Sequence, residues 1–162
     1  MKKFQKQFLM CSALILSLFL FDLTLCPAQE KNMAGWGIND PYNLLYDVQE
    51  VDTIKAVIRD IKEITPLPGM APGLGMEIEE KSGDRYMVHI CPLAYKDAGS
   101  IGLKKGDKID LRGCLVEIDG KEVIMAAKIK KGEKAIKVRL TSDGKPFWAM
   151  SPEELKKELA DN

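Results

Sequence analysis

Three side chains that could bind a soft metal ion stand at alternate positions of one segment. Met87, His89 and Cys91 occupy i, i+2 and i+4, and on a β-strand this spacing places a thioether, an imidazole and a thiol on one face. The donors suit copper(I), with Met70 or Met76 as a fourth ligand. Same-face neighbours on a strand are about 6.6 Å apart, so three of them converge poorly on one ion. The alternative is a structural role, in which His89 is hydrogen-bonded near the end of the strand.

The cysteines allow a second role for the same segment. Of the four cysteines, Cys11 and Cys26 fall in the N-terminal leader described below, which leaves Cys91 and Cys114. An even pair in an exported protein predicts a disulfide. Two buried free thiols are the alternative, because the sequence does not show whether the Cα atoms come within the roughly 4.4–6.8 Å that the bond requires.

A basic edge follows further along the chain. It consists of Lys128, Lys130, Lys131 and Lys134, continued by Lys137 and Arg139. We expect a solvated hairpin that faces a partner, such as an envelope protein, a small ligand or anionic lipid. Single-stranded nucleic acid is bound by basic grooves with aromatic side chains that stack on bases. Tyr86 is the only aromatic residue of the predicted strands, so we do not expect nucleic-acid binding.

The sequence holds no complete catalytic motif. It has one histidine, which would have to serve any general-base mechanism. Asp107 and Asp119 precede or follow glycines in predicted turns, where short polar side chains have a structural role. We therefore expect a protein that is not an enzyme.

Alternating apolar and polar residues define the elements that position these side chains. The alternation runs through residues 86–91, 109–113, 123–129 and 136–140, with glycine-containing turns at 105–107, 119–121, 131–133 and 143–145. Period two is the signature of β-strands. The pattern predicts an all-β fold: a small OB-like antiparallel β-barrel of five to six strands, with a short helix at residues 93–98 between strands 3 and 4.

Residues 51–64 fit either an amphipathic helix or a strand. Their apolar positions recur every three or four residues, but most of these are Val or Ile, whose restricted χ1 favours strands. We predict a long first strand with a bulge near Val57. Residues 65–75 hold three prolines and three glycines and should form an exposed loop. At the other end, Ser151, Pro152 and Glu154 predict a capping box that begins a C-terminal helix.

The N-terminus predicts export. Three lysines precede an apolar run from Phe8 to Phe21 that is short for a bilayer span, and the small Ala28 follows. We predict a signal peptide cleaved after Ala28 and a periplasmic protein. Lipidation at Cys26, which would give a membrane-anchored lipoprotein, is one alternative, and an uncleaved membrane anchor is another. The chain has 24 basic and 24 acidic residues; cleavage would remove three lysines and one aspartate and leave a charge of about −2, a poor match for non-specific phosphate binding.

The predicted organisation has four parts. A signal peptide covers residues 1–28, a linker 29–47, an OB-like β-barrel 48–148 and a C-terminal helical tail 149–162. Trp36 and Tyr42 lie in the linker, and the sequence leaves open whether these aromatic residues dock onto the barrel or belong to a loose segment.

The order of several short motifs resembles a known family. The motifs are Val51-Asp52-Thr53-Ile54, Val88-His89-Ile90-Cys91-Pro92 with Tyr95, residues 103–109, Asp119-Gly120-Lys121 and residues 143–148. In this order they resemble the domain of the magnetosome proteins MamS and MamX, over roughly residues 48–148. The resemblance implies a small periplasmic or membrane-associated barrel, with a link to iron handling and redox only in the magnetosome members.

The chain departs from that family in two positions. Cys91 stands where the family usually has glycine, and Cys114 stands where it has a small polar residue. A haem-attachment Cys-x-x-Cys-His motif is absent from the sequence, so haem binding is not carried over. We expect a non-catalytic binding or accessory module of the bacterial cell envelope without a cofactor. The alternative is a periplasmic metal-binding protein that handles copper or iron through His89 and its sulfur neighbours.

Overall fold

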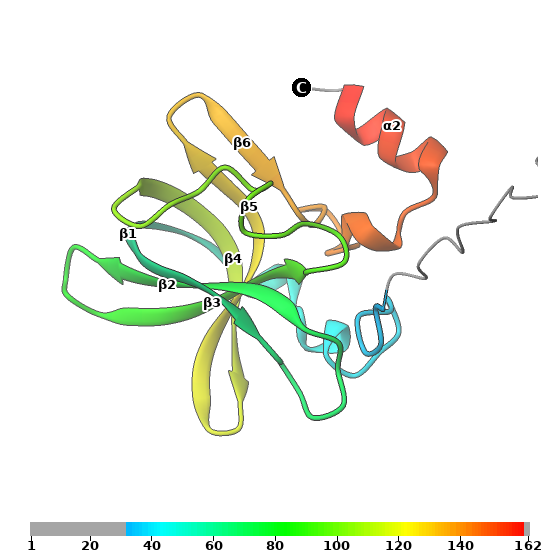
Figure 1. Ribbon diagram of the computed structural model, residues 1–162, viewed down its shortest axis with the longest axis horizontal. Helices are drawn as coiled ribbons and strands as arrows, with labels where there is room; N and C mark the ends of the chain where they lie inside the picture. The colour runs from blue at the N-terminus through cyan, green and yellow to red at the C-terminus, as the bar shows by residue number, and fades with distance from the viewer. Residues whose placement is uncertain (1–31, 161–162) are drawn as a thin grey trace, which may run out of the picture. The chain divides into compact units, whose positions relative to one another are not determined.

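The computed structural model describes residues 32–160 (Figure 1). The predicted signal peptide, its cleavage after Ala28 and the alternative lipidation of Cys26 lie outside the described residues. Six strands make up most of the fold: β1 (Val51–Ile64), β2 (Gly73–Glu80), β3 (Arg85–Pro92), β4 (Lys108–Ile118), β5 (Lys121–Lys131) and β6 (Lys134–Lys137). Three short 3-10 helices, η1 (Asn43–Leu45), η2 (Val48–Glu50) and η3 (Phe147–Ala149), and one α-helix, α2 (Pro152–Ala160), complete the described part.

All six strands belong to one sheet. Its order is β3-β2-β1-β4-β5-β6, and consecutive neighbours in this order pair antiparallel. In addition, β3 and β5 pair in parallel. This last pairing joins the two ends of the β3-β2-β1-β4-β5 order, so each of these five strands pairs with two others of the five, and β5 also pairs with β6. The predicted all-β class is confirmed as a mostly antiparallel sheet of six strands with one C-terminal helix.

The long first strand and its bulge are confirmed. The first half of β1 pairs with β4, from Val51 to Val57, and the second half pairs with β2. The register with β2 shifts between Ile58 and Asp60 and leaves Arg59 unpaired, two residues past the predicted position. Ala56 and Ile58 are buried before the shift. β1 can pair with β4 along its first half and with β2 along its second half because the bulge increases the bend and twist of the strand.

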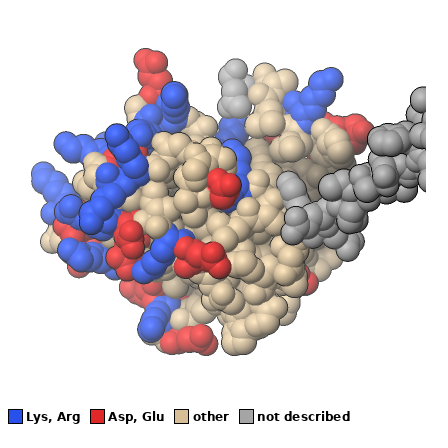
Figure 2. Space-filling model, viewed as in Figure 1, with Lys and Arg blue, Asp and Glu red and all other residues tan. Residues whose placement is uncertain are grey.

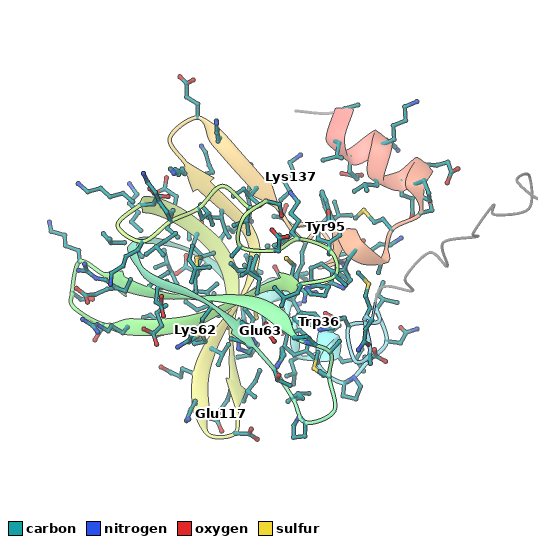
Figure 3. All side chains as sticks on the ribbon, viewed as in Figure 1. Trp36, Lys62, Glu63, Tyr95, Glu117 and Lys137 are labelled. Carbon is teal, nitrogen blue, oxygen red and sulfur yellow. The ribbon has the colours of Figure 1, made fainter. Side chains whose placement is uncertain are left out.

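The segment before β1 docks onto the sheet. Trp36 and Tyr42 are each 1% exposed, and they form a second apolar cluster with residues that include Ala71 and Met125. The indole of Trp36 donates a hydrogen bond from Nε1 to the carbonyl of Ala71 at 2.8 Å. The ring of Trp36, which is labelled in Figure 3, packs edge-on against Trp148, with centroids 5.6 Å apart. Of the two alternatives for these aromatic residues, docking is the one found.

The connection between β3 and β4 corrects one prediction. The structure has no helix at residues 93–98; the chain turns there. Tyr95 and Lys96 donate backbone hydrogen bonds to the carbonyl of Pro92, and this turn does not continue. Asp97 and Ser100 then exchange hydrogen bonds that involve both side chains. Such local side-chain bonds compete with helix formation, which explains the turn.

The last strand and the tail differ in how well they were predicted. β6 ends at Lys137, whereas alternation predicted a strand to residue 140; beyond it, only a single bridge joins Arg139 to Pro146. The capping box of α2 is confirmed. Ser151 N donates to the Glu154 carboxylate at 2.9 Å, and Glu154 N donates to Ser151 Oγ at 3.2 Å.

Candidate functional site

A bulge in β3 separates the three predicted metal donors. β2 pairs Leu74 with Cys91 and the next residue, Gly75, with His89, so Ile90 has no partner in β2. The extra residue changes the phase of the strand. Cys91 therefore joins the main apolar cluster, while Met87 packs against the second cluster. The prediction that all three donors share one face is wrong.

Met87 and His89 do meet in one cleft. The loop after β1 contributes Thr65 and Pro66 to it, and the β4–β5 turn contributes Asp119. The parallel pairing of β3 and β5 brings these parts together, because it sets Met87 opposite Val123. We call this space of about 370 Å³ the loop cleft. Its other lining residues are Ile64, Ile118, Lys121 and Glu122.

His89 is the buried polar group of the loop cleft. Its side chain is 6% exposed, and its Nδ1 has no hydrogen-bond partner among the described residues. The imidazole lies beside the ring of Tyr42, with centroids 5.9 Å apart. Burial lowers the pKa of His89 to about 4, so the ring is neutral at pH 7. The unprotonated nitrogen of a neutral imidazole can accept a hydrogen bond from a ligand, or it can coordinate a metal ion.

The predicted disulfide is not formed. Cys91 and Cys114 are both free and buried. Their strands, β3 and β4, are not neighbours in the sheet, and Cys114 lies opposite Val51 and Met125 instead. Burial raises the pKa of the Cys91 thiol to about 12 and also raises that of Cys114. Both are therefore protonated and poor nucleophiles in the folded protein.

The residues of the predicted lysine surface lie in different surroundings in the structure. Lys130 lines an open groove of about 650 Å³ beside β1 and β2. Lys128 lines a different cavity, next to α2. Lys131 forms an ion pair with Asp107 at 2.6 Å, and Lys134 is exposed at the start of β6.

The open groove carries charges of both signs. Figure 2 shows Lys and Arg gathered on the side of the molecule that bears β1 and the β2–β3 turn, with Asp and Glu between them. Arg59 in the groove is paired with Glu79 at 2.6 Å, and Glu79 also binds Arg85 at 2.7 Å. Although this groove is larger than the loop cleft, its charges partly satisfy one another, and it has no buried polar group without a partner.

Sequence reasoning missed the position of Arg139. This residue is 3% exposed, and its Nη2 donates to Asn43 Oδ1 at 2.7 Å. Its guanidinium lies over the rings of Tyr46 and Trp148, at 5.1 and 4.9 Å from their centroids. Burial lowers the pKa of Arg139 from its usual value. No sequence signal distinguishes this arginine from the exposed lysines around it, because its burial depends on residues 43, 46 and 148.

Comparison with known proteins places the chain in a family. Residues 50–136, more than half of the chain, match the model of the MamS/MamX magnetosome protein family. The chain belongs to this family. The match confirms the resemblance seen in the sequence and covers the MamS/MamX domain from the start of β1 into β6. It includes Met87 and His89 of the loop cleft and ends before Arg139 and α2.

Other comparisons add less to the MamS/MamX assignment. No curated protein matches the chain. A chain of a replication protein A heterotrimer bound to ssDNA is similar in structure over 52% of this chain and 59% of its own length, with 12% identity and a TM-score of 0.39. At that score the similarity supports no conclusion about fold or ligand. Within residues 32–160, no helix has the length and apolar character needed to cross a bilayer.

Proposed function

We propose that this protein is an exported, non-catalytic binding module of the bacterial cell envelope, built on an OB-like β-barrel. Two findings support the barrel. Five strands pair in a ring, and the parallel contact between β3 and β5 completes it. In the OB-fold, a five-stranded barrel, ligands bind on one face between the loop after strand 1 and the loop after strand 4. The loop cleft lies between the same two loops.

The observation that carries the binding function is the composition of the loop cleft. Its volume of about 370 Å³ falls in the range of small-ligand sites, roughly 300–1,000 Å³. Apolar side chains such as Ile64, Ile118 and Val123 form much of its lining, and His89 supplies a buried polar group without a partner. A mostly apolar cleft with a few polar groups to orient a ligand is typical of a binding site.

The location rests on separate support. The apolar leader predicts export, and membership of a magnetosome protein family favours the cell envelope. The non-catalytic role is part of the same proposal and rests on the sequence, whose one histidine would have to serve any general-base mechanism.

Native mass spectrometry of the full chain purified from the envelope tests the binding function. We expect a bound species that is lost on denaturation. The variant Thr65→Trp places a large side chain on the exposed rim of the cleft and should abolish this species. Thr53→Trp, at an exposed position of β1 outside the cleft, is the matched control and should retain it. Equal retention in both variants would contradict a site in the loop cleft.

Metal binding is the second candidate function. Its support is that a neutral imidazole and the thioether of Met87 line the same cleft, and both are donors for copper; imidazole also suits iron. Under this proposal, a stoichiometric metal adduct in the native mass disappears in His89→Ala. A bound organic species that survives His89→Ala favours the non-metal binding function instead.

A further inference from the structure

Three cationic side chains stand in a row across the outer face of the sheet. The register sets Arg112 of β4 opposite Lys128 of β5, and Lys128 opposite Lys137 of β6. Each cationic residue has an apolar neighbour in the sequence, and these neighbours pair with one another and face the core: Leu111, Ile129 and Ile136. Because side chains alternate along a strand, the cationic row faces outward. Like charges directly opposite one another destabilise a sheet. Among residues 32–160, none of the three forms an ion pair.

A small cavity lies over this row. The three side chains line it together with Arg139, and its volume is about 250 Å³. Arg139 is almost completely buried and lacks a carboxylate partner in the described part of the chain. Since a buried cation without a counterion is costly, the site would gain from a bound negative charge. We call this space the anion cavity.

Helix α2 supplies the opposite wall of the anion cavity. Glu158 lines the cavity, and Lys137 Nζ donates a hydrogen bond to the backbone carbonyl of Glu158 at 3.4 Å. In Figure 3, Lys137 lies between β6 and α2. Thr141 adds a hydroxyl to the lining. Four cationic residues and one carboxylate residue therefore line the cavity, which gives its lining a net charge of +3.

We propose that the anion cavity binds the phosphate group of a small soluble molecule. Arginine and lysine are the side chains that hold phosphate oxygens, arginine through paired hydrogen bonds and lysine as a point charge. The volume lies just under the roughly 300–1,000 Å³ of sites for drug-sized ligands, which favours a small phosphate compound. The anion cavity shares no lining residue with the loop cleft, so the two sites can be tested independently.

The test is an NMR titration of the full chain with inorganic phosphate and with glycerol 3-phosphate, at pH 7 and constant ionic strength. We expect saturable shifts in β6 and α2. The double variant Lys128→Gln/Lys137→Gln should bind roughly tenfold more weakly or worse, because two charges at contact distance are removed. Glu158→Gln should bind more tightly, since it removes the competing carboxylate. Lys134→Gln, an exposed lysine outside the cavity, is the matched control and should bind like the wild type.

A vesicle experiment distinguishes a lipid headgroup from a soluble phosphate compound. Vesicles of phosphatidylglycerol and of phosphatidylcholine are sedimented with each variant. Binding of phosphatidylglycerol vesicles without binding of either soluble phosphate would overturn the proposal, because it would indicate attraction to a charged surface. Unchanged affinity in a folded double variant would also overturn it. Thermal unfolding verifies the fold, and removal of like charges from the row should not lower the melting temperature.

Discussion

His89 should make the stability of this protein depend on pH in a range where no other side chain does. It is the only histidine of the chain, and burial lowers its pKa from 6.5 to about 4. In the unfolded chain the imidazole takes up a proton below about pH 6.5, while in the folded protein it stays neutral until about pH 4. Between these values the unfolded state binds more protons, so the free energy of unfolding falls as the pH falls.

The size of the effect follows from the two pKa values. Proton binding to the unfolded state should lower the free energy of unfolding by about 2 kcal/mol between pH 7 and pH 5, and by about 3 kcal/mol between pH 7 and pH 4. The carboxylates with lowered pKa values, such as Glu79 and Asp107, start from unfolded values of 4.5 and 3.8. Their contribution is lost only below about pH 5, so the range from pH 5 to 6.5 isolates His89.

Urea denaturation at a series of pH values measures this dependence. The wild type should lose about 2 kcal/mol from pH 7 to pH 5, whereas His89→Gln should be nearly flat over the same range. Both proteins need an affinity tag without histidine, or none. A wild type whose stability is as flat as that of His89→Gln, or a pKa of His89 near 6.5 in an NMR titration, would refute the effect of burial on this imidazole.

Two further predictions concern the docked segment and the thiols. Gly73→Ala should lower the free energy of unfolding by about 1–3 kcal/mol, because an added Cβ would lie 2.4 Å from Cζ2 of the buried Trp36. Urea denaturation measures this loss of stability. The control is Gly99→Ala, whose Cβ would meet nothing closer than 3.5 Å and which should leave the stability unchanged. Equal effects at the two glycines would contradict the packing of Trp36. Cys91 and Cys114 are both buried free thiols, so they should resist alkylation in the folded protein and be alkylated in denaturant without reductant. Peptide mapping that finds the two cysteines linked would contradict this prediction and show a disulfide.

Features set by neighbouring residues were predicted well. The strands follow from alternation, the bulge of β1 falls two residues from its predicted position, and the capping box of Ser151 and Glu154 forms with both hydrogen bonds. Each depends on contacts within a few residues or on a single buried face. The helix expected at residues 93–98 failed for an equally local reason, because the hydrogen bonds of Asp97 and Ser100 favour a turn.

Whether the candidate site residues meet depends on the register between strands, which the sequence pattern does not give. Met87, His89 and Cys91 have the spacing of one face, but the unpaired Ile90 breaks that face, and a bulge of this kind is set by the partner strand. Cys91 and Cys114 looked like a pair until the sheet order placed their strands apart. The lysines of β5 looked like one surface, but Lys128 and Lys130 line two different cavities.

The sequence by itself determined a mostly β protein with a capped C-terminal helix and a relationship to the MamS/MamX family, and it predicts an N-terminal leader for export. These follow from periodicity, turn residues and short motifs. Only the tertiary structure decided which side chains meet: His89 with the loop after β1, and Arg112, Lys128 and Lys137 in one row beside Arg139. The physical reason is that strand register and sheet closure are cooperative properties of pairs of strands, and one residue of shift turns every side chain to the other face.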